Sequence, residues 1–201
     1  LSDRVLAASG RGHTAEQAEK ACIAVKKAGF FLVGQMMVGL PMSEPEDELF
    51  TASRLCALGS DAARIYPTVV LRGTELQNLT EAGQYTPLSI KEAVIRSRDV
   101  LEIFVSHNIP VIRIGLCASD NLSSERDFYA GAYHPAMGEL TESALFLKRI
   151  NKELASFITT GGLSGLDITI LCPRGATSKI IGQKRRNIAA IQNEFNVNKI
   201  K

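Results

Sequence analysis

Five polar side chains stand within or directly after three apolar stretches of this sequence, where they could bind a substrate. The stretches cover residues 30–41, 64–72 and 111–116. Each has the length and composition of a buried strand, and a helical pattern precedes it. Polar groups at the carboxyl ends of parallel strands commonly form the binding site of such a repeat, so we expect a substrate cavity there. The five candidates are Gln35, Arg64, Tyr66, Arg72 and Arg113.

The helices that must position these strands are marked by capping residues. Helices are expected over residues 2–8, 14–28, 43–58, 74–82 and 89–107, with strands over 30–38, 61–71 and 111–115. A stripe of small apolar residues between Ala18 and Ala28 predicts that the helix over 14–28 packs on a sheet. The capping residues are Thr14 with Gln17, Ser43 with Glu46, Ser89 with Glu92, and Thr74 alone.

Strands that alternate with helices at this spacing predict right-handed parallel crossovers, and hence an α/β sheet or part of a barrel. Three strands cannot close a barrel. The edge formed by residues 30–38 would be bare unless missing N-terminal strands or a partner chain cover it. The chain starts at Leu1 without a Met, so we expect the natural protein to extend further at its N-terminus.

The composition is that of a globular protein. Of the 201 residues, 45% are hydrophobic and 22% are charged, which suits one sizeable core. The longest apolar run, residues 30–40, is too short to span a bilayer, so we expect no membrane partner. The cysteines lie far apart, which argues against a metal site and indicates a reduced, cytoplasmic chain with buried thiols. They are Cys22, Cys56, Cys117 and Cys172.

The C-terminal part is a separate electrostatic unit. Residues 174–201 contain seven basic residues against one acid, Glu194. An irregular region over residues 118–133, a helix over 138–157 and a Gly-rich linker over 159–165 are predicted to precede it. Residues 167–172 alternate like a strand, and residues 178–195 are helical with a break at Gly182.

Several motifs, in this order, resemble the radical S-adenosylmethionine (SAM) enzymes. They are LSDRVLAASGRGHT at residues 1–14, GQMMVGLP at 34–41, RIYPTVVLRGTEL at 64–76 and GQY at 83–85. Together they resemble the catalytic subunit of Elongator and its short bacterial relatives, and more distantly the oxygen-independent coproporphyrinogen oxidases. The resemblance covers residues 1–115 and implies the C-terminal part of a parallel (β/α) barrel.

In that family a 4Fe-4S cluster, bound by a CxxxCxxC loop, converts SAM to a 5′-deoxyadenosyl radical. This sequence has no such loop. We therefore expect a missing N-terminal segment to bind the cluster and this chain alone to be inactive.

The resemblance also implies roles for three residues in binding SAM. Arg11 would pair with the methionyl carboxylate, Gln35 would reach the ribose hydroxyls, and Met37 would contact adenine. Purely structural roles are the alternative. Arg11 would then only hold its own loop in place, and Gln35 and Met37 would be core residues. His13 is expected to fix its loop rather than to act in catalysis.

The tail, residues 168–200, resembles the core of a KH RNA-binding module. The resemblance implies a strand, a helix, a GxxG-type turn and a second helix whose Ile188 and Ile191 face inward. The turn here reads Gly-Gln-Lys-Arg, so an Arg replaces the second Gly. A basic amphipathic helix without RNA is the alternative. The implied RNA-binding residues are Lys179, Gly182, Lys184, Arg185 and Arg186.

The predicted fold class is α/β. A partial parallel (β/α) barrel of the radical SAM type is expected over residues 1–116, an irregular cover, a helix and a linker over 117–165, and a small KH-like α+β unit over 166–201. The implied function is part of a radical SAM iron-sulfur enzyme that modifies RNA, with tRNA as its partner. Two alternatives stay open: a radical SAM enzyme acting on a small molecule such as a porphyrinogen, and a non-catalytic RNA-binding protein.

Overall fold

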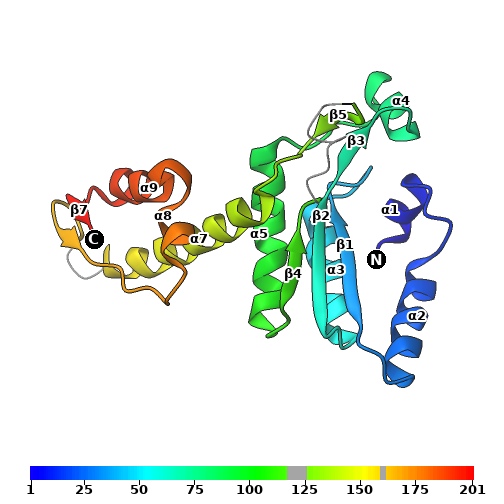
Figure 1. Cartoon of the computed structure of the whole chain (residues 1–201), viewed down its shortest axis with the longest axis horizontal. Helices are drawn as coiled ribbons and strands as arrows, with labels where there is room; N and C mark the ends of the chain where they lie inside the picture. The colour runs from blue at the N-terminus through cyan, green and yellow to red at the C-terminus, as the bar shows by residue number, and fades with distance from the viewer. Residues whose placement is uncertain (117–125, 159–161) are drawn as a thin grey trace. The chain divides into compact units, whose positions relative to one another are not determined.

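A computed structural model of the chain describes residues 1–116, 126–158 and 162–201 (Figure 1). The described residues form two compact units, Leu1–Gly138 and Glu139–Lys201. Residues 118–125 of the predicted irregular region and residues 159–161 of the predicted linker lie outside the described residues. The domain boundaries predicted at residues 116 and 165 stay predictions.

The first unit contains a parallel sheet of three strands in the order β1-β2-β4 (Figure 1). These strands are β1 (Val33–Val38), β2 (Ala62–Pro67) and β4 (Val111–Ile114). Both pairings are parallel, so the predicted α/β class with helical crossovers is confirmed. Among the described residues β1 pairs only with β2, and it therefore forms one edge of the sheet.

Two helices cover one face of this sheet. They are α3 (Pro45–Ala57), which packs on β1, and α5 (Ile90–Ser106), which packs on β2 and β4 and against α3. Ala52 and Leu55 of α3 and Val100 and Phe104 of α5 are buried there. The predicted capping pair Ser89 and Glu92 begins α5 as expected. The prediction of Ser43 as the cap of α3 is wrong, because Glu44 caps this helix with Asp47.

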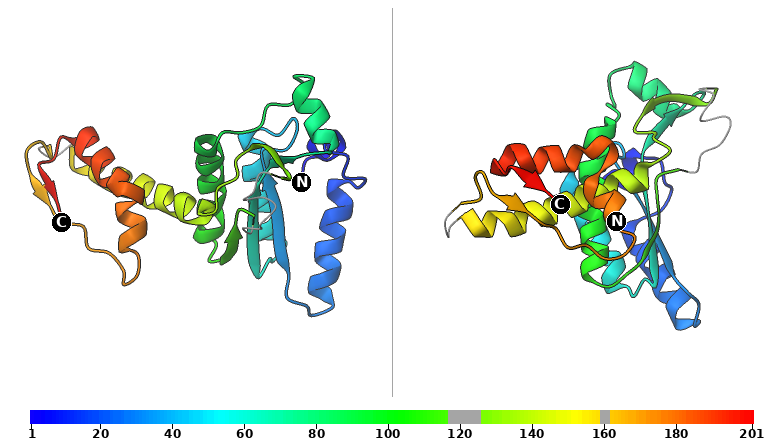
Figure 2. Two further views of the ribbon diagram at one scale, coloured as in Figure 1. Left: turned by 45° about the horizontal axis from the view of Figure 1, so that its top comes forward. Right: turned by 60° about the vertical axis from the view of Figure 1, so that its left-hand side comes forward.

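The helices α1 (Asp3–Ala8) and α2 (Ala15–Lys27) lie beyond the β1 edge of the sheet (Figure 2). Thr14 and Gln17 cap α2 as predicted, but α2 buries none of its residues. The prediction that its apolar stripe packs on a sheet holds only in part: Ala18, Cys22 and Val25 are half-buried, and Ala18 and Cys22 line a cavity beside β1. The stripe is not fully buried because α2 lies beside the edge strand β1 rather than flat on a face of the sheet.

The stretch predicted as one strand over 61–71 divides in two. β2 ends at Pro67, and β3 (Val69–Leu71) pairs antiparallel with β5 (Phe128–Gly131), a strand in a region predicted to be irregular. Thr68 lies between the two halves and donates from both its backbone N and its Oγ1 to the carbonyl oxygen of Val38. Thr74 caps α4 (Glu75–Glu81) as predicted.

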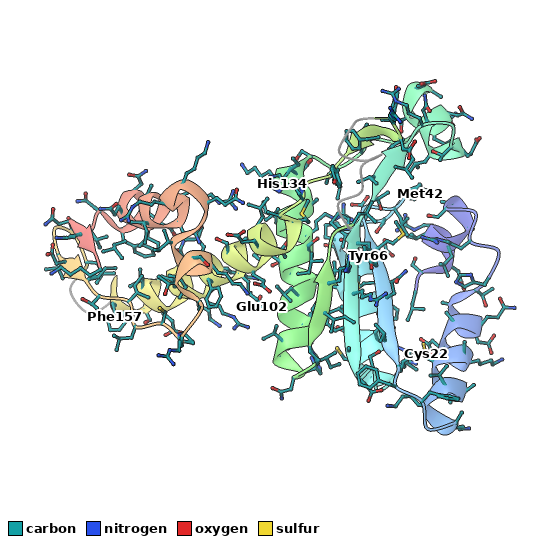
Figure 3. The ribbon with its side chains drawn as sticks, viewed as in Figure 1. Cys22, Met42, Tyr66, Glu102, His134 and Phe157 are labelled. Atoms are coloured by element: carbon teal, nitrogen blue, oxygen red, sulfur yellow. The ribbon has the colours of Figure 1, made fainter. Side chains whose placement is uncertain are left out.

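Side chains alternate between the two faces of the sheet. Met36 and Ile65 are buried toward α3 and α5, whereas Met37 and Tyr66, which follow them in β1 and β2, are half-buried on the other face. Tyr66 is labelled on the sheet in Figure 3. This second face carries all of the polar candidates predicted from the sequence except Arg72.

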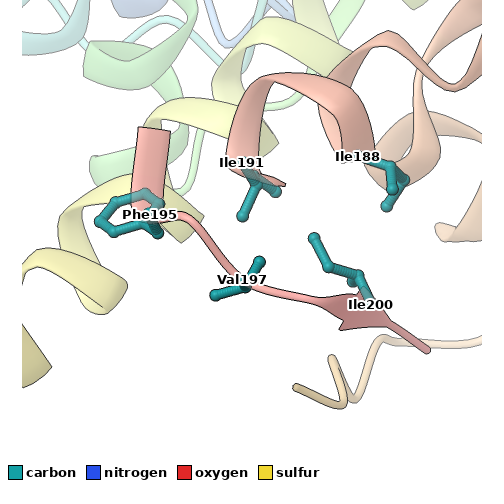
Figure 4. Close-up of a cluster of buried hydrophobic side chains, with 5 residues drawn as sticks. All are labelled: Ile188, Ile191, Phe195, Val197 and Ile200. Atoms are coloured by element: carbon teal, nitrogen blue, oxygen red, sulfur yellow. The ribbon is translucent and has the colours of Figure 1, made fainter. Parts of the chain in front are cut away.

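The second unit is small and has its own core. It is built from α7 (Met137–Ile158), whose first two residues belong to the first unit, and from α8 (Thr177–Ile181), α9 (Arg186–Phe195) and a two-stranded parallel sheet of β6 (Asp167–Ile168) and β7 (Lys199–Ile200). The predicted strand over 167–172 is thus shorter than expected. The predicted helix break at Gly182 is confirmed. The core residues are Ile188, Ile191, Phe195, Val197 and Ile200 (Figure 4).

No helix in the described part of the chain is long and apolar enough to cross a membrane.

Candidate functional site

Three of the predicted polar residues form a row across the sheet. The strand register places Gln35 of β1 opposite Arg64 of β2, and Arg64 opposite Arg113 of β4. Arg64 is half-buried, whereas Gln35 and Arg113 are exposed. The next row toward the carboxyl ends of the strands pairs Met37 with Tyr66. Four of the five candidates therefore share one face of the sheet.

Arg72 lies outside this row. It follows β3, which leaves the parallel sheet to pair with β5, and its backbone N donates to the carbonyl oxygen of Asp127 at 2.8 Å. Its guanidinium carbon lies 5.6 Å from the ring centroid of Tyr129, within range of a cation–π interaction. This exposed side chain is placed by the β3–β5 ribbon, a feature that the sequence did not indicate.

A cavity of about 300 Å³ lies at the edge strand β1, lined also by α1, by α2 and the loop before it, and by α3. Arg11, Gln35 and Met37, the residues predicted to bind SAM, all line it. Nη2 of Arg11 lies 2.6 Å from Sδ of Met37. His13 also lines the cavity, and its Nδ1 donates to the carbonyl oxygen of Arg11 at 3.0 Å, which fits the loop-fixing role expected for it.

A buried ion pair supports the turn that ends β1. Glu48 of α3, which also lines the cavity, is only 3% exposed. Its carboxylate accepts from the backbone N of Gly39 at 2.6 Å, from Ser43 Oγ at 3.2 Å and from the guanidinium of Arg96 of α5. Burial raises the pKa of Glu48, while the donors around it act in the opposite direction.

The phenol of Tyr85 holds the same turn. It donates to the carbonyl oxygen of Gly39 at 2.6 Å, and burial raises the pKa of Tyr85 to about 12. Sequence reasoning missed both Glu48 and Arg96. An acid on the inward face of α3 and a base on the inward face of α5 were the available signal, but only the packing of the two helices pairs them.

The three cysteines in the described part of the chain do not gather into a site. Cys22 and Cys56 are half-buried, and burial raises the pKa of both thiols. Cys172 is exposed, so the prediction of a buried thiol is wrong there, and Cys117 lies outside the described residues. Within residues 1–116, 126–158 and 162–201, no group of three or more His, Cys, Asp or Glu side chains is placed to hold a metal ion.

The second unit presents a basic turn between α8 and α9. Lys184, Arg185 and Arg186 are exposed there, and the first two have the positive φ angles 52° and 59°. Gly182 has φ 73° and ψ 160°, a conformation that is open essentially to glycine alone. Lys179, the fifth predicted RNA contact, is half-buried and forms an ion pair with Glu142 of α7.

The buried side chain of Asn187 fixes the conformation of this turn. It is 1% exposed, and its Nδ2 donates to the carbonyl oxygens of Ser143 at 3.0 Å and Ile180 at 3.1 Å. A Cβ on Gly182 would lie 2.9 Å from Cγ of Asn187. The turn is therefore held in one conformation by packing as well as by its own backbone. The sequence did not single out Asn187.

Comparison with known proteins identifies the class of fold. Residues 60–146 match the Radical_SAM C-terminal domain family. The solved structure of Elp3 from Methanocaldococcus infernus with residues 1–46 deleted superposes with a TM-score of 0.58 at 23% identity, covering 75% of this chain and 34% of that one. The chain thus has the mixed α/β fold of a radical SAM protein, consistent with part of a (β/α) barrel.

Curated relatives define the branch. The chain is 29% identical over 122 residues to an uncharacterized protein of Methanocaldococcus jannaschii, covering 61% of this chain and 37% of that protein. It is 30% identical over 97 residues to the tRNA uridine(34) acetyltransferase of the same organism, covering 47% of this chain and 18% of that enzyme. The chain therefore spans less than half the length of either relative. With the domain match, these similarities confirm the predicted resemblance to the Elongator-like branch of the radical SAM enzymes.

Proposed function

We propose that this chain is part of a radical SAM iron-sulfur enzyme that modifies tRNA. In this proposal the first unit supplies part of the SAM site and the second unit supplies a basic RNA-binding tail. The observation that carries the proposal is the cavity beside β1, around which Arg11, Gln35 and Met37 meet from separate parts of the sequence. Relatives that include a tRNA uridine(34) acetyltransferase support RNA as the substrate.

The residues around the cavity suit the parts of SAM. The permanently charged guanidinium of Arg11 would hold the methionyl carboxylate, and the amide of Gln35 can donate to and accept from ribose hydroxyls. Met37 offers a polarisable apolar surface to adenine. When bound together with a reduced cluster, SAM supplies a 5′-deoxyadenosyl radical. The described residues do not fit an iron-sulfur cluster, which we assign to a segment N-terminal to this chain, so that the chain alone would be inactive.

The basic turn suits the phosphate backbone of RNA. Three adjacent exposed cations, Lys184 to Arg186, attract phosphates in a way that does not depend on base sequence and weakens with salt. The order of strand, helix, glycine turn and helix in the second unit supports the proposal of a KH-like module. The inward-facing Ile188 and Ile191 are buried in its core.

Labelled tRNA tests the binding half of this proposal. The chain should bind it with an affinity that falls steeply between low and physiological salt, and simultaneous Lys184→Ala, Arg185→Ala and Arg186→Ala changes should abolish that salt-sensitive binding. A variant with Lys27, Lys91 and Arg126 replaced by Ala removes the same charge from exposed positions of the first unit and should bind normally. Equal loss in both variants, or binding that ignores salt, contradicts a dedicated RNA surface and favours a small-molecule substrate.

The catalytic half is tested with the chain extended to its natural N-terminus and reconstituted anaerobically with iron and sulfide. It should release 5′-deoxyadenosine from SAM, and bulk tRNA should increase that release. Arg11→Ala should weaken SAM binding measured by equilibrium dialysis. A protein that binds tRNA but leaves SAM intact is a non-catalytic RNA-binding protein, and the proposal is then wrong.

A further inference from the structure

Arg64 of β2 differs from the other half-buried cations of this chain. Within the described residues, every other half-buried Lys or Arg forms an ion pair with an acid, because burying a charge without a partner is costly. Arg64 is half-buried as well, but it has no ion pair or hydrogen bond in the described part of the chain. The paired cations are Lys26, Arg54, Arg96, Arg98 and Lys179.

The guanidinium of Arg64 also has a buried donor. Its Nε is shielded from solvent and has no acceptor among residues 1–116, 126–158 and 162–201. A buried donor without an acceptor carries the desolvation penalty of that group in full. A ligand that accepts from this Nε and neutralises the charge would remove both costs.

The neighbouring side chains on this face of the sheet do not supply such an acceptor. Ala62 and Tyr66 precede and follow Arg64 on the same face of β2, and Gln35 lies opposite it on β1. None of the three carries a negative charge. Arg113 lies opposite on β4, is itself a cation and has an interaction partner of its own. A bound anion is therefore the partner that suits Arg64.

We propose that Arg64 anchors a subsite for an oxyanion of the substrate, either a phosphate or a carboxylate. A planar guanidinium binds two oxygens of either group through parallel hydrogen bonds, and Nε can donate one of them. Gln35, opposite Arg64, lines the cavity beside β1, so the anion would lie next to the proposed SAM site. The subsite rests on the proposed function only in taking the ligand as a substrate, and it requires neither RNA nor the basic turn.

Inorganic phosphate and acetate are the probes for this subsite. Each is compared with chloride at the same ionic strength, and the melting temperature is measured, since a ligand that binds the folded chain raises it. Phosphate also stabilises proteins generally because it is excluded from their surface, so the natural chain is compared with Arg64→Met. At least one of the two anions should stabilise the natural chain more than the variant.

Titration of the natural chain then identifies the source of the anion. Tighter binding of phosphate indicates a substrate that carries a phosphate, such as a nucleotide, and tighter binding of acetate indicates a small organic acid. Arg64→Met should weaken binding of the preferred anion by about tenfold or more, because it removes both charge-assisted hydrogen bonds.

Arg98→Met is the matched control. Arg98 is also half-buried, but it is paired with its neighbour Asp99 on α5, so the response to both anions should not change. Without either anion, Arg64→Met should melt no lower than the natural chain. This change removes a charge and a donor that lack a partner and keeps a side chain of similar length.

Three results would overturn the subsite. Equal responses of the natural chain and Arg64→Met to both anions would show that Arg64 binds neither. A clearly lower melting temperature of Arg64→Met in chloride would reveal a partner within the protein. Loss of SAM binding with normal binding of both anions would assign Arg64 to the cofactor. Salt-sensitive tRNA binding and release of 5′-deoxyadenosine are measured separately, so the proposed function can persist when the subsite fails.

Discussion

Arg96 of α5 holds the buried carboxylate of Glu48 of α3 through two contacts, Nη2 to Oε1 at 2.6 Å and Nε to Oε2 at 2.9 Å. The same carboxylate accepts from the backbone N of Gly39, so one ion pair ties both covering helices to the turn after β1. This turn follows Gln35 and Met37 in the chain. The pair thus supports the wall of the candidate SAM cavity.

Replacing Arg96 by Met should destabilise the first unit strongly. The change leaves Glu48 buried without its partner, which typically costs about 3–5 kcal/mol of unfolding free energy. Urea unfolding followed by circular dichroism measures the loss. Arg98→Met is the matched control, since Arg98 of the same helix pairs with its neighbour Asp99, and a loss of about 0–1 kcal/mol is expected. Similar losses in the two variants would contradict a supporting role for the Glu48–Arg96 pair.

The phenol of Tyr85 should ionise only at unusually high pH. Because burial raises its pKa to about 12, an absorbance titration should show one phenolate that forms only near that pH. Tyr85→Phe should remove this step and Tyr129→Phe should leave it. The folded pKa exceeds the usual value of about 10, so the stability contributed by Tyr85 is complete below about pH 10 and is lost as the pH rises toward 12. A titration without a late step would show that the phenol is solvated.

Asp61 should stabilise the fold only while it is ionised. Nζ of Lys26 donates to both carboxylate oxygens, at 2.8 and 2.7 Å, and the backbone N of Leu32 donates as well. These contacts hold the pKa of Asp61 below its usual range. Its contribution is therefore present above about pH 4 and is lost as the pH falls through the lowered pKa.

Melting temperatures at two pH values check this expectation. Asp61→Asn should lower the melting temperature at pH 7, and the difference from the natural chain should shrink in strong acid. Glu16→Gln is the control, because Glu16 only forms an exposed pair with Lys20 on α2, and little change is expected. A difference for Asp61→Asn that is the same at both pH values would exclude the charge as its cause.

Gly182→Ala should disrupt the basic turn. The residue has φ 73°, and a Cβ there would lie 2.9 Å from Cγ of Asn187 and 3.1 Å from Oγ of Ser143. Strain and overpacking together should cost about 1–3 kcal/mol of unfolding free energy, measured by thermal melting. Gly175→Ala separates the two causes, because Gly175 also has a positive φ, 83°, but open space around its Cβ position. Equal losses would show that backbone strain alone matters.

The main elements of the fold were predictable because they rest on local chemistry. Thr14 and Ser89 cap helices through their own neighbours, and apolar runs bounded by Gly and Pro form strands wherever a sheet is available. The shared face of Gln35, Arg64 and Arg113 could also be predicted from the sequence. Side chains alternate along a strand, and each of these residues has a similar position in its own strand.

Tertiary structure alone decided the rest. The partnership of Glu48 and Arg96 depends on how two helices pack, and the course of the chain at Arg72 depends on the pairing of β3 with β5. The stripe on α2 is no more than half-buried because this helix lies beside an edge strand. Each of these depends on contacts between residues far apart in the sequence. Local patterns specify which faces of an element are apolar or charged, whereas only packing determines what those faces meet.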